Sequence, residues 1–201
     1  MGQKARFFPA DVADESSVRR TVDYAREEFG RLDIVVNNAG VASPPVAIDL
    51  MEEALFDRLF NTNVKSVFLF CRHAVPVLRE AGGGSIINTA STSALKPRPM
   101  NAGYAASKAA VLTLTKALAL ELAGDSIRVN ALTPVASDTP LFRDFLGDGA
   151  EQKRTEIEAA IPLGRLGLPS DMAACAAFLA SDEASFITGT ELIIDGGMLA
   201  Q

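Results

Sequence analysis

Two hydrophobic periodicities alternate along the chain. Apolar residues recur at helical spacing over residues 14–29, 51–79, 101–122 and 171–179. Short apolar runs typical of strands lie at 4–9, 32–36, 85–89, 127–132 and 192–194. The pattern therefore predicts strands that alternate with helices, with one irregular insert at about 134–169. A break in the second helical region is expected near Pro76, because proline lacks a backbone N–H.

The ends of these segments carry suitable residues. Asp14 precedes the first helical segment as a capping residue, and Gly30 follows it in the position that favours a left-handed backbone. The run 32–36 (LDIVV) is continuously apolar, as expected of a strand that is buried on both faces of a parallel sheet. It ends in the turn-forming sequence Asn-Asn-Ala-Gly at 37–40. The glycines at 82–84 precede a strand and are interpreted as a turn.

Alternating strands and helices of this size predict right-handed crossovers onto a mainly parallel sheet. The expected fold class is therefore α/β, with three layers and a single domain over residues 1–201. In such sheets, ligands bind beyond the carboxyl ends of the strands. The residues that follow each strand are thus the first candidates for a functional site.

Composition narrows the possible partners. The 201 residues are 48% hydrophobic and 22% charged, which is ordinary globular usage. A net charge of -6 argues against nucleic acid as a partner. No run approaches the roughly 20 apolar residues that span a membrane, and the two cysteines, Cys71 and Cys175, suit a reducing compartment. We therefore expect a cytoplasmic protein without membrane or nucleic-acid partners.

Two polar residues at the start of the third helical segment indicate acid/base chemistry. Tyr104 and Lys108 are four residues apart and share one helix face, so the ammonium favours the ionised phenol. Ser91, at the carboxyl end of a strand, is expected to face the same crevice. Each residue also has a structural interpretation: Tyr104 as a half-buried aromatic beside a solvated Lys108, and Ser91 as a strand-end cap.

Taken together, the motifs resemble the short-chain dehydrogenase/reductase family over essentially the whole chain, in particular its 3-oxoacyl-(acyl carrier protein) reductase and glucose dehydrogenase members. The resemblance implies a Rossmann-like three-layer fold. The matching elements, in family order, are Asp11-Val12, NNAG at 37–40, Asn63 in NTNVKSVF, INTAS ending at Ser91, YAASK at 104–108, RVNAL around Asn130, the segment 134–139 and IIDGG ending at Gly197.

The resemblance implies a catalytic set of four residues. Tyr104 would exchange a proton with a substrate carbonyl or alcohol, and Ser91 would hydrogen-bond the same oxygen. Lys108 would lower the pKa of Tyr104 and hold the nicotinamide ribose. Asn63 would hold a water molecule that connects Lys108 to solvent; its structural interpretation is a polar residue that interrupts a helix. No metal is expected, since the only histidine, His73, is interpreted as a surface or interface residue.

The resemblance also implies that the chain binds NAD or NADP. The cofactor-binding residues would be Asp11, Val12, Asn37, Ala39, Gly40, Tyr104, Lys108, Pro134 and Thr139. The turn at 37–40 is equally explained as a tight connection after a buried strand. Val135 stands where the family commonly has glycine, so the turn must avoid positive φ or strain the valine.

A second departure from the family pattern is that the printed residues contain no glycine-rich phosphate loop. The chain resembles the family from its third strand onward, so we expect an N-terminally truncated Rossmann-like fold in which the first two strands and their helices are absent. An exposed sheet edge, lower stability, altered oligomerisation or aggregation and weaker cofactor binding are the expected consequences.

The insert at about 137–163 resembles the substrate lid of the family. Its apolar residues favour a partly hydrophobic carbonyl or alcohol as the substrate; they are Leu141, Phe142, Phe145 and Leu146. The helices at 63–78 and after Tyr104 resemble the pair through which family members form dimers and tetramers, so a homodimer or homotetramer is expected.

The sequence thus predicts an NAD(P)-dependent oxidoreductase that interconverts a carbonyl and an alcohol. A second hypothesis is a catalytically impaired fragment, or a non-catalytic dimerising partner of a full-length family member. A third is a sugar-nucleotide epimerase, since such enzymes share the Tyr-x-x-x-Lys pattern. The ending IIDGG leaves no room for the larger substrate domain of an epimerase, so this hypothesis ranks last.

Overall fold

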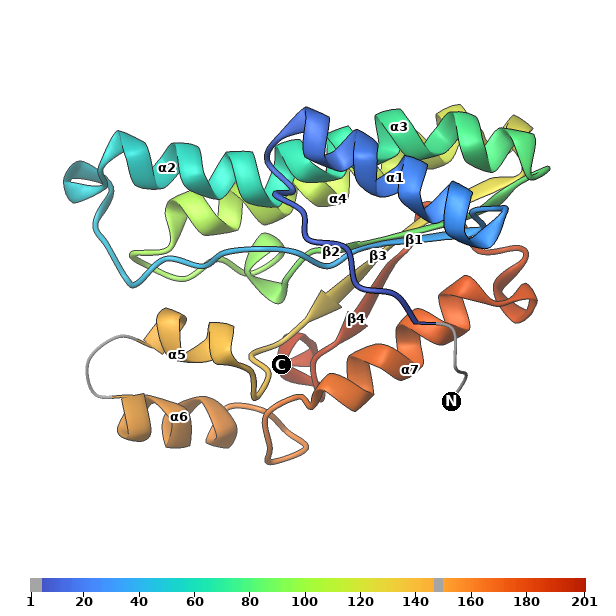
Figure 1. Ribbon diagram of the computed structural model, residues 1–201. Helices are drawn as coiled ribbons and strands as arrows, with labels where there is room; N and C mark the ends of the chain where they lie inside the picture. Colours follow the sequence, from blue (N-terminus) through green and yellow to red (C-terminus); the bar gives the residue numbers. More distant parts are fainter. Residues whose placement is uncertain (1–4, 147–149) are drawn as a thin grey trace.

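The centre of the molecule is a four-stranded parallel sheet. The computed structural model describes residues 5–146 and 150–201, and within these ranges the strand order is β1-β2-β3-β4 (Figure 1). The register pairs Val35 with Ile86, and Ile86 with Val129. The strands are β1 (Ile34–Asn37), β2 (Gly84–Thr89), β3 (Ile127–Pro134) and β4 (Glu191–Ile194).

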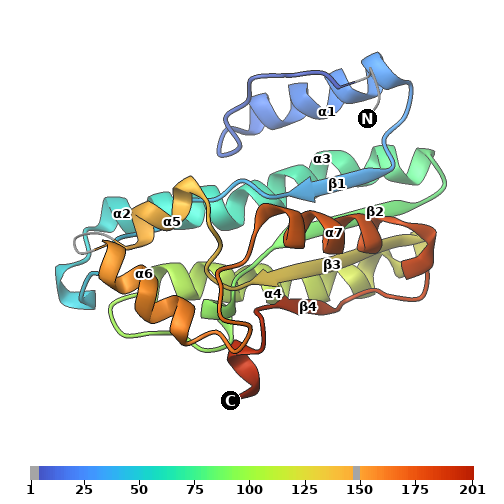
Figure 2. The same ribbon diagram turned by 90° about the horizontal axis from the view of Figure 1, so that it is seen from below.

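Helices cover both faces of the sheet, which confirms the predicted three-layer α/β fold (Figures 1 and 2). One face carries α1 (Glu15–Phe29), α2 (Glu53–Phe60), α3 (Ser66–Glu80) and α4 (Ala102–Leu122). The other face carries α7 (Pro169–Ala180), which contacts β2, β3 and β4. The insert after β3 forms α5 (Pro140–Leu146) and α6 (Ala150–Ala159), next to the carboxyl ends of the strands.

Both faces of the sheet are packed with aliphatic side chains. Ile86 and Val129 point into the layer of α3 and α4, whereas Ile87 and Leu132 point toward α7 and its Leu179. All five are buried. Complete burial of one such side chain contributes about 1.5–3 kcal/mol to the free energy of unfolding. The continuous apolar runs of β2 and β3 thus reflect strands that are covered on two sides. The prediction that the run at 32–36 is buried on both faces is wrong, because no described helix covers the outer face of β1 and Ile34 and Val36 are exposed there.

The first helix begins and ends where its capping residues predict. The Asp14 carboxylate accepts a hydrogen bond from the backbone N–H of Ser17 at 2.8 Å. Gly30 adopts a φ of 79° after the last turn and donates its N–H to the carbonyl oxygen of Arg26 at 2.8 Å. The turn before β2 also forms as predicted, and Gly83 has a φ of 130° there.

The prediction of a strand at 4–9 is wrong, because residues 5–10 form no regular structure. The segment lies against α1 instead, where Phe8 stacks on Tyr24 with ring centroids 4.8 Å apart. The expected exposed sheet edge is present, because β1 is the terminal strand of the sheet and no described strand pairs with its outer side. Residues 5–10 do not pair with this edge either.

The predicted break near Pro76 is also wrong, since α3 continues through this proline. Pro76 and Arg72, whose carbonyl would have accepted the missing N–H, are both exposed, so water can solvate the free carbonyl. The irregularity lies earlier, where Asn61–Lys65 form a π-helical turn between α2 and α3. Such turns widen a helix locally and are frequent at functional sites.

The structure also describes the state of the cysteines and the length of the apolar helices. Cys71 and Cys175 are both free, and burial raises the pKa of the Cys71 thiol to about 12. Within the described residues, no helix has the length and apolar character required to cross a membrane.

Candidate active site

The largest cavity described, here called the main cavity, opens at the carboxyl ends of the strands and has a volume of about 580 Å³. Its walls come from the segments that follow β1, β2 and β3, the start of α4, the start of α5 and the C-terminal residues. This is the position that a parallel α/β sheet favours for a ligand. Segments far apart in sequence meet here, as Figure 1 shows for the ends of β2 and β3 beside α5.

Ser91 and Tyr104 meet in the main cavity, as predicted. Ser91 follows β2 and Tyr104 lies in the first turn of α4. Burial raises the pKa of Tyr104, and a hydrogen bond with the Ser91 side chain partly opposes this effect. The Ser91 hydroxyl oxygen also accepts a hydrogen bond from the backbone N–H of Ser93 at 3.2 Å. Ser91 is therefore both a cap and a residue of the cavity wall.

Lys108 lies one helical turn after Tyr104 and also lines the main cavity. Its Nζ donates a hydrogen bond to the carbonyl oxygen of Thr89 at 2.8 Å and lies 5.9 Å from the centre of the Tyr104 ring. Lys108 is buried, and this burial lowers its pKa to about 8. Burial therefore dominates the pKa of Tyr104, and the lowering by Lys108 that the resemblance implies stays a prediction.

Asn63 lies behind the wall of the main cavity, in the π-helical turn. Its Oδ1 accepts the backbone N–H of Val41 at 2.8 Å, and its Nδ2 donates to the Val41 carbonyl at 3.0 Å and to the Ser107 hydroxyl at 3.0 Å. A Cβ placed on Gly40 would lie 3.2 Å from Asn63 Oδ1 and 3.4 Å from Lys108 Nζ. Asn63 thus fixes the turn after β1 against Lys108.

The residues predicted to bind a cofactor fall into four groups, according to the cavity that they line. Gly40, Pro134 and Thr139 line the main cavity together with Tyr104 and Lys108. Ala39 lines both this cavity and a second one of about 260 Å³ beside β1, here called the edge cavity.

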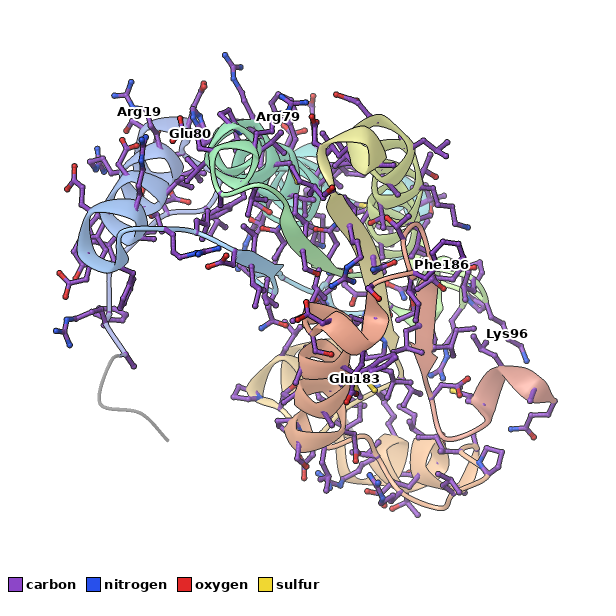
Figure 3. All side chains as sticks on the ribbon, turned by 90° about the vertical axis from the view of Figure 1, so that its right-hand side faces the viewer. Arg19, Arg79, Glu80, Lys96, Glu183 and Phe186 are labelled. Atoms are coloured by element: carbon purple, nitrogen blue, oxygen red, sulfur yellow. The ribbon has the colours of Figure 1, made fainter. Side chains whose placement is uncertain are left out.

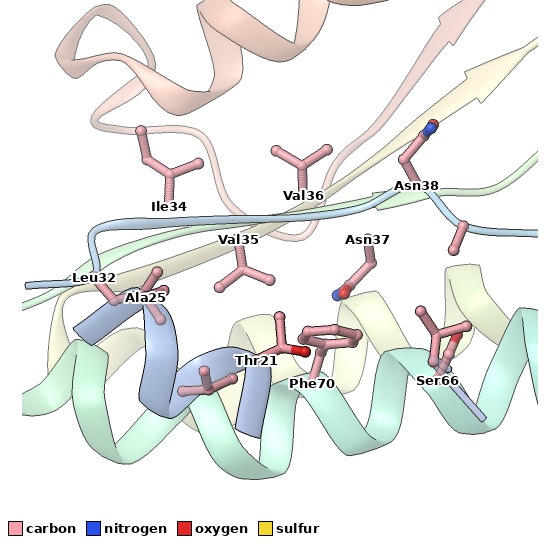
Figure 4. A pocket seen from close by; sticks show the side chains of 13 residues that line it. Thr21, Ala25, Leu32, Ile34, Val35, Val36, Asn37, Asn38, Ser66 and Phe70 are labelled. Carbon is pink, nitrogen blue, oxygen red and sulfur yellow. The ribbon is translucent and has the colours of Figure 1, made fainter. Parts of the chain in front are cut away.

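The edge cavity also contains Val12 and Asn37, and Figure 4 shows the Asn37 side chain on the side of Phe70 and Ser66. Its amide donates a hydrogen bond to Asn88 Oδ1 at 2.8 Å. Asp11 lines none of the three cavities described, and its carboxylate accepts a hydrogen bond from the backbone N–H of Ala13 at 2.9 Å.

Val135, which stands where the family commonly has glycine, does not adopt a positive φ. Among the described residues, only Met100 and Ser126 combine a side chain with a positive φ, so the turn at Val135 avoids this strain. The Val135 N–H donates to the carbonyl oxygen of Ile194 at 3.0 Å, which continues the pairing of β3 and β4. The chain therefore leaves β3 in an extended conformation.

Sequence reasoning missed several residues of the cavity wall, among them Lys96, Arg98 and Met198. They lie outside the motifs, and only proximity to Ser91 and Tyr104 in sequence could have indicated the first two. It also missed the buried contact of Asn88 with Thr115, in which Nδ2 donates to Oγ1 at 2.9 Å. The sequence offered one signal for that contact, since both residues are polar and lie within apolar runs.

A metal site finds no support in the described part of the chain, which has no group of three potential ligands. His73 is more enclosed than predicted, since its side chain is only 19% exposed and its Nε2 lies 3.3 Å from Glu15 Oε1. The contact joins α3 to α1. The chemistry available in the main cavity is therefore that of a phenol, a hydroxyl and an ammonium, a set suited to proton transfer and to hydrogen bonding of an oxygen atom.

Comparison with known proteins shows the family to which the chain belongs. A family model described as enoyl-(acyl carrier protein) reductase matches residues 1–199. The chain is 42% identical over 195 residues to 4-formylbenzenesulfonate dehydrogenase TsaC1/TsaC2 of Comamonas testosteroni, covering 96% of the chain and 77% of that relative.

Two solved structures are also similar. A 3-ketoacyl-(acyl-carrier-protein) reductase from Brucella melitensis, complexed with NADH, superposes with a TM-score of 0.88 at 44% identity, covering 94% of this chain and 76% of that one. ElxO with NADP bound superposes with a TM-score of 0.90 at 33% identity, covering 98% of this chain and 79% of that one. The chain belongs to the short-chain dehydrogenase/reductase family of oxidoreductases.

Proposed function

We propose that this chain is an NAD(P)-dependent oxidoreductase that interconverts a carbonyl and an alcohol by hydride transfer. The observation that carries the proposal is the hydrogen bond between Ser91 and Tyr104 in the main cavity, with the buried ammonium of Lys108 beside the phenol. The relative named for 4-formylbenzenesulfonate, a compound with a formyl group, and the neighbours bound to NADH and NADP support it.

In this proposal Tyr104 carries the proton. In the direction of reduction, its hydroxyl gives a proton to the carbonyl oxygen, and in oxidation its phenolate takes one from the alcohol. The Ser91 hydroxyl donates a hydrogen bond to the same oxygen and stabilises the charge that develops there. The nicotinamide cofactor supplies the hydride donor or acceptor.

Lys108 fits the cofactor that the proposal requires. Thr89 is the one acceptor that its ammonium has within the described part of the chain, and an ammonium has three donors. The remaining donors are suited to ribose hydroxyls. Gly40, which has no room for a Cβ beside Lys108, lets the backbone approach such a group closely. The positive charge of Lys108 also favours the phenolate of Tyr104 once water has been excluded.

Asn63 has a positioning role in this account. Its amide N–H groups are both used by Val41 and Ser107, whereas Oδ1 can accept one more hydrogen bond beyond that from Val41. This lone pair suits a water molecule between Oδ1 and Lys108, as the resemblance implies. Asn63 would therefore hold the turn at Gly40 and support proton exchange between Lys108 and solvent.

The segment 137–163 is proposed as the substrate lid of the domain. Leu141 and Phe142 line the main cavity, whereas the Phe145 side chain and residues 147–149 lie outside the described residues. We also propose assembly through α3 and α4, because Phe68 and Leu120 on these helices are 48% and 85% exposed. Sedimentation of the protein would show a dimer or tetramer, and a monomer would contradict this assembly.

Titration with NADH and NADPH, followed by nicotinamide fluorescence, tests the cofactor assignment. Micromolar binding of either nucleotide supports the proposal, and the preferred one is then used to screen carbonyl substrates. Absence of binding at millimolar concentrations, which corresponds to an affinity of about 4 kcal/mol or less, would favour a non-catalytic partner of other family members.

A further inference from the structure

The charged residues around the main cavity are of one sign. Lys96, Arg98 and Lys108 line it, and no Asp or Glu occurs among its described lining residues. This is unexpected in a chain with a net charge of -6. Lys96 and Arg98 are exposed, and neither takes part in an ion pair with any residue that the structure describes. Their charges are therefore available to a ligand.

Arg98 also lines a smaller neighbouring cavity of about 190 Å³, here called the side cavity. The main and side cavities share Arg98 and Pro99. The guanidinium reaches the C-terminal segment, with Nη2 3.8 Å from Met198 Sδ. The loop that contains Arg98 and Met100 is held to the segment after β1 by a hydrogen bond from the Val46 N–H to the Met100 carbonyl at 2.9 Å. A ligand that extends from Tyr104 toward the side cavity would pass this guanidinium.

Two residues that line the side cavity have a buried polar atom without a hydrogen-bond partner among the described residues, namely Ser43 Oγ and Asn101 Oδ1. These residues are only 1% and 4% exposed. A buried polar atom left unpaired costs about 1–3 kcal/mol, so such atoms usually have a partner that is protein, water or ligand. Asn101 Nδ2 contacts Ser93 Oγ at 3.4 Å, and rotation of the amide would keep a hydrogen bond with this hydroxyl while turning the NH₂ group into the cavity.

Lys153 and Glu156 also line the side cavity, and Lys153 Nζ donates to the carbonyl oxygen of Leu146 at 2.8 Å. The two cavities together thus have four cations and one carboxylate among their described lining residues. The remaining walls of the side cavity are largely apolar, including Pro45, Leu146 and Ile157.

On the basis of the proposed function, we propose that the substrate carries a carboxylate or a similar oxyanion at the end remote from the reacting carbon, and that Arg98 binds this anion at the junction of the main and side cavities. Ser43 and the Asn101 amide complete the site with two further hydrogen bonds. An arginine suits this role because its planar guanidinium can bind both oxygens of a carboxylate. The substrate class is thus a hydroxy or oxo acid with an apolar body.

Calorimetric titration with 4-(hydroxymethyl)benzoate and with its uncharged methyl ester tests this inference, and it requires no turnover. We expect the acid to bind at least about tenfold more tightly than the ester, the difference that one charge-assisted hydrogen-bonded pair produces. The preference should weaken as salt is added. Equal affinity, tighter binding of the ester, or no binding of either compound at millimolar concentrations would overturn the inference.

Variants separate the site from general charge effects. Arg98→Gln should abolish the preference for the acid and Arg98→Lys should retain part of it. Arg19→Gln is the matched control, because Arg19 is an exposed arginine of α1 on the far side of the molecule from Lys96 (Figure 3). A similar loss of preference in Arg19→Gln and Arg98→Gln would contradict the assignment.

Ser43→Ala adds a readout that a structural role would not give. Its hydroxyl has no hydrogen-bond partner in the part of the chain that the structure describes, so removal should leave the melting temperature unchanged or raise it while the acid binds several-fold more weakly. A fall in melting temperature with unchanged acid binding would contradict the proposed role. A preference for the acid without any NAD(P)H-dependent reduction of carbonyl compounds would refute the proposed function and leave the anion site standing.

Discussion

Ser91 and Tyr104 belong to different elements, yet their side chains are hydrogen-bonded within the main cavity. The bond opposes the effect of burial on the phenol, so each residue influences how readily the other can exchange a proton. In the proposed mechanism, the Tyr104 hydroxyl transfers the proton and the Ser91 hydroxyl holds the oxygen that receives it.

Ser91→Ala is expected to slow turnover about 10- to 1,000-fold, because a hydrogen bond to the developing charge is lost. It should also raise the pKa of Tyr104 further, since the Ser91 hydrogen bond lowers it. The pH dependence of the alcohol oxidation rate measures this change. The rate should begin to rise at a higher pH in Ser91→Ala than in the native protein. Ser185→Ala, at an exposed serine beyond α7, is the control, and an equal effect there would contradict the assignment.

Gly40→Ala should reduce both stability and activity. The new Cβ would lie 3.2 Å from Asn63 Oδ1 and 3.4 Å from Lys108 Nζ, so at least one of these groups must move. We expect a loss of about 1–3 kcal/mol in the free energy of unfolding, as for other overpacked sites. Gly124→Ala is the matched control, since its Cβ would meet nothing within 4 Å. Denaturant unfolding of both variants measures this loss. Equal free energies of unfolding for Gly40→Ala and Gly124→Ala would refute the proposed crowding.

The buried ammonium of Lys108 makes stability depend on pH. Burial lowers its pKa from 10.5 to about 8. Between these values the unfolded chain binds more protons than the folded one, so the free energy of unfolding should rise with pH from about 8 to about 10.5. The full gain from this group is roughly 3 kcal/mol.

Denaturant unfolding at several pH values, with Lys108→Met as the comparison, isolates this contribution. The variant lacks the titrating group, so the stability difference between the native protein and Lys108→Met should change in favour of the native protein as pH rises. If the free energies of unfolding of the two proteins change in parallel with pH, the lowered pKa of Lys108 is contradicted.

Asn63→Ala should destabilise the turn after β1 more than a typical surface substitution. The change leaves the N–H and carbonyl of Val41 without the partner that now binds both, in a buried setting. We expect a loss of about 2–4 kcal/mol. Hydrogen exchange should locate the loss, with faster exchange at the Val41 amide. Exchange that is unchanged at Val41 would show that Asn63 does not hold this turn.

Most of the fold follows from local sequence. The four paired strands and the helices at 14–29, 101–122 and 171–179 form where apolar periodicity and capping residues predict them. The strand expected at 4–9 does not form, because a strand needs a neighbour and periodicity describes only one side of the pairing. The interruption near Pro76 was misplaced because solvent can satisfy a free carbonyl on an exposed helix face.

The candidate site was predictable to the extent that its residues follow strands. Ser91, Tyr104 and Lys108 meet as expected, since the carboxyl ends of parallel strands share one edge of the sheet. The dominance of burial over the Ser91 hydrogen bond in setting the Tyr104 pKa depends on solvent exclusion, which spacing does not reveal. Arg98 and the unpartnered Ser43 hydroxyl became visible only in three dimensions, because loops without a motif bring them together.

The central claim is that Tyr104 transfers the proton during reduction or oxidation, and Tyr104→Phe tests it most directly. The substitution removes one hydroxyl and keeps the packed ring, so stability and nucleotide affinity should change little. Steady-state kinetics, with the preferred nucleotide and the best carbonyl substrate from a screen, should show a fall in kcat of about 10²- to 10⁴-fold. Turnover within a few-fold of the native protein would contradict the account.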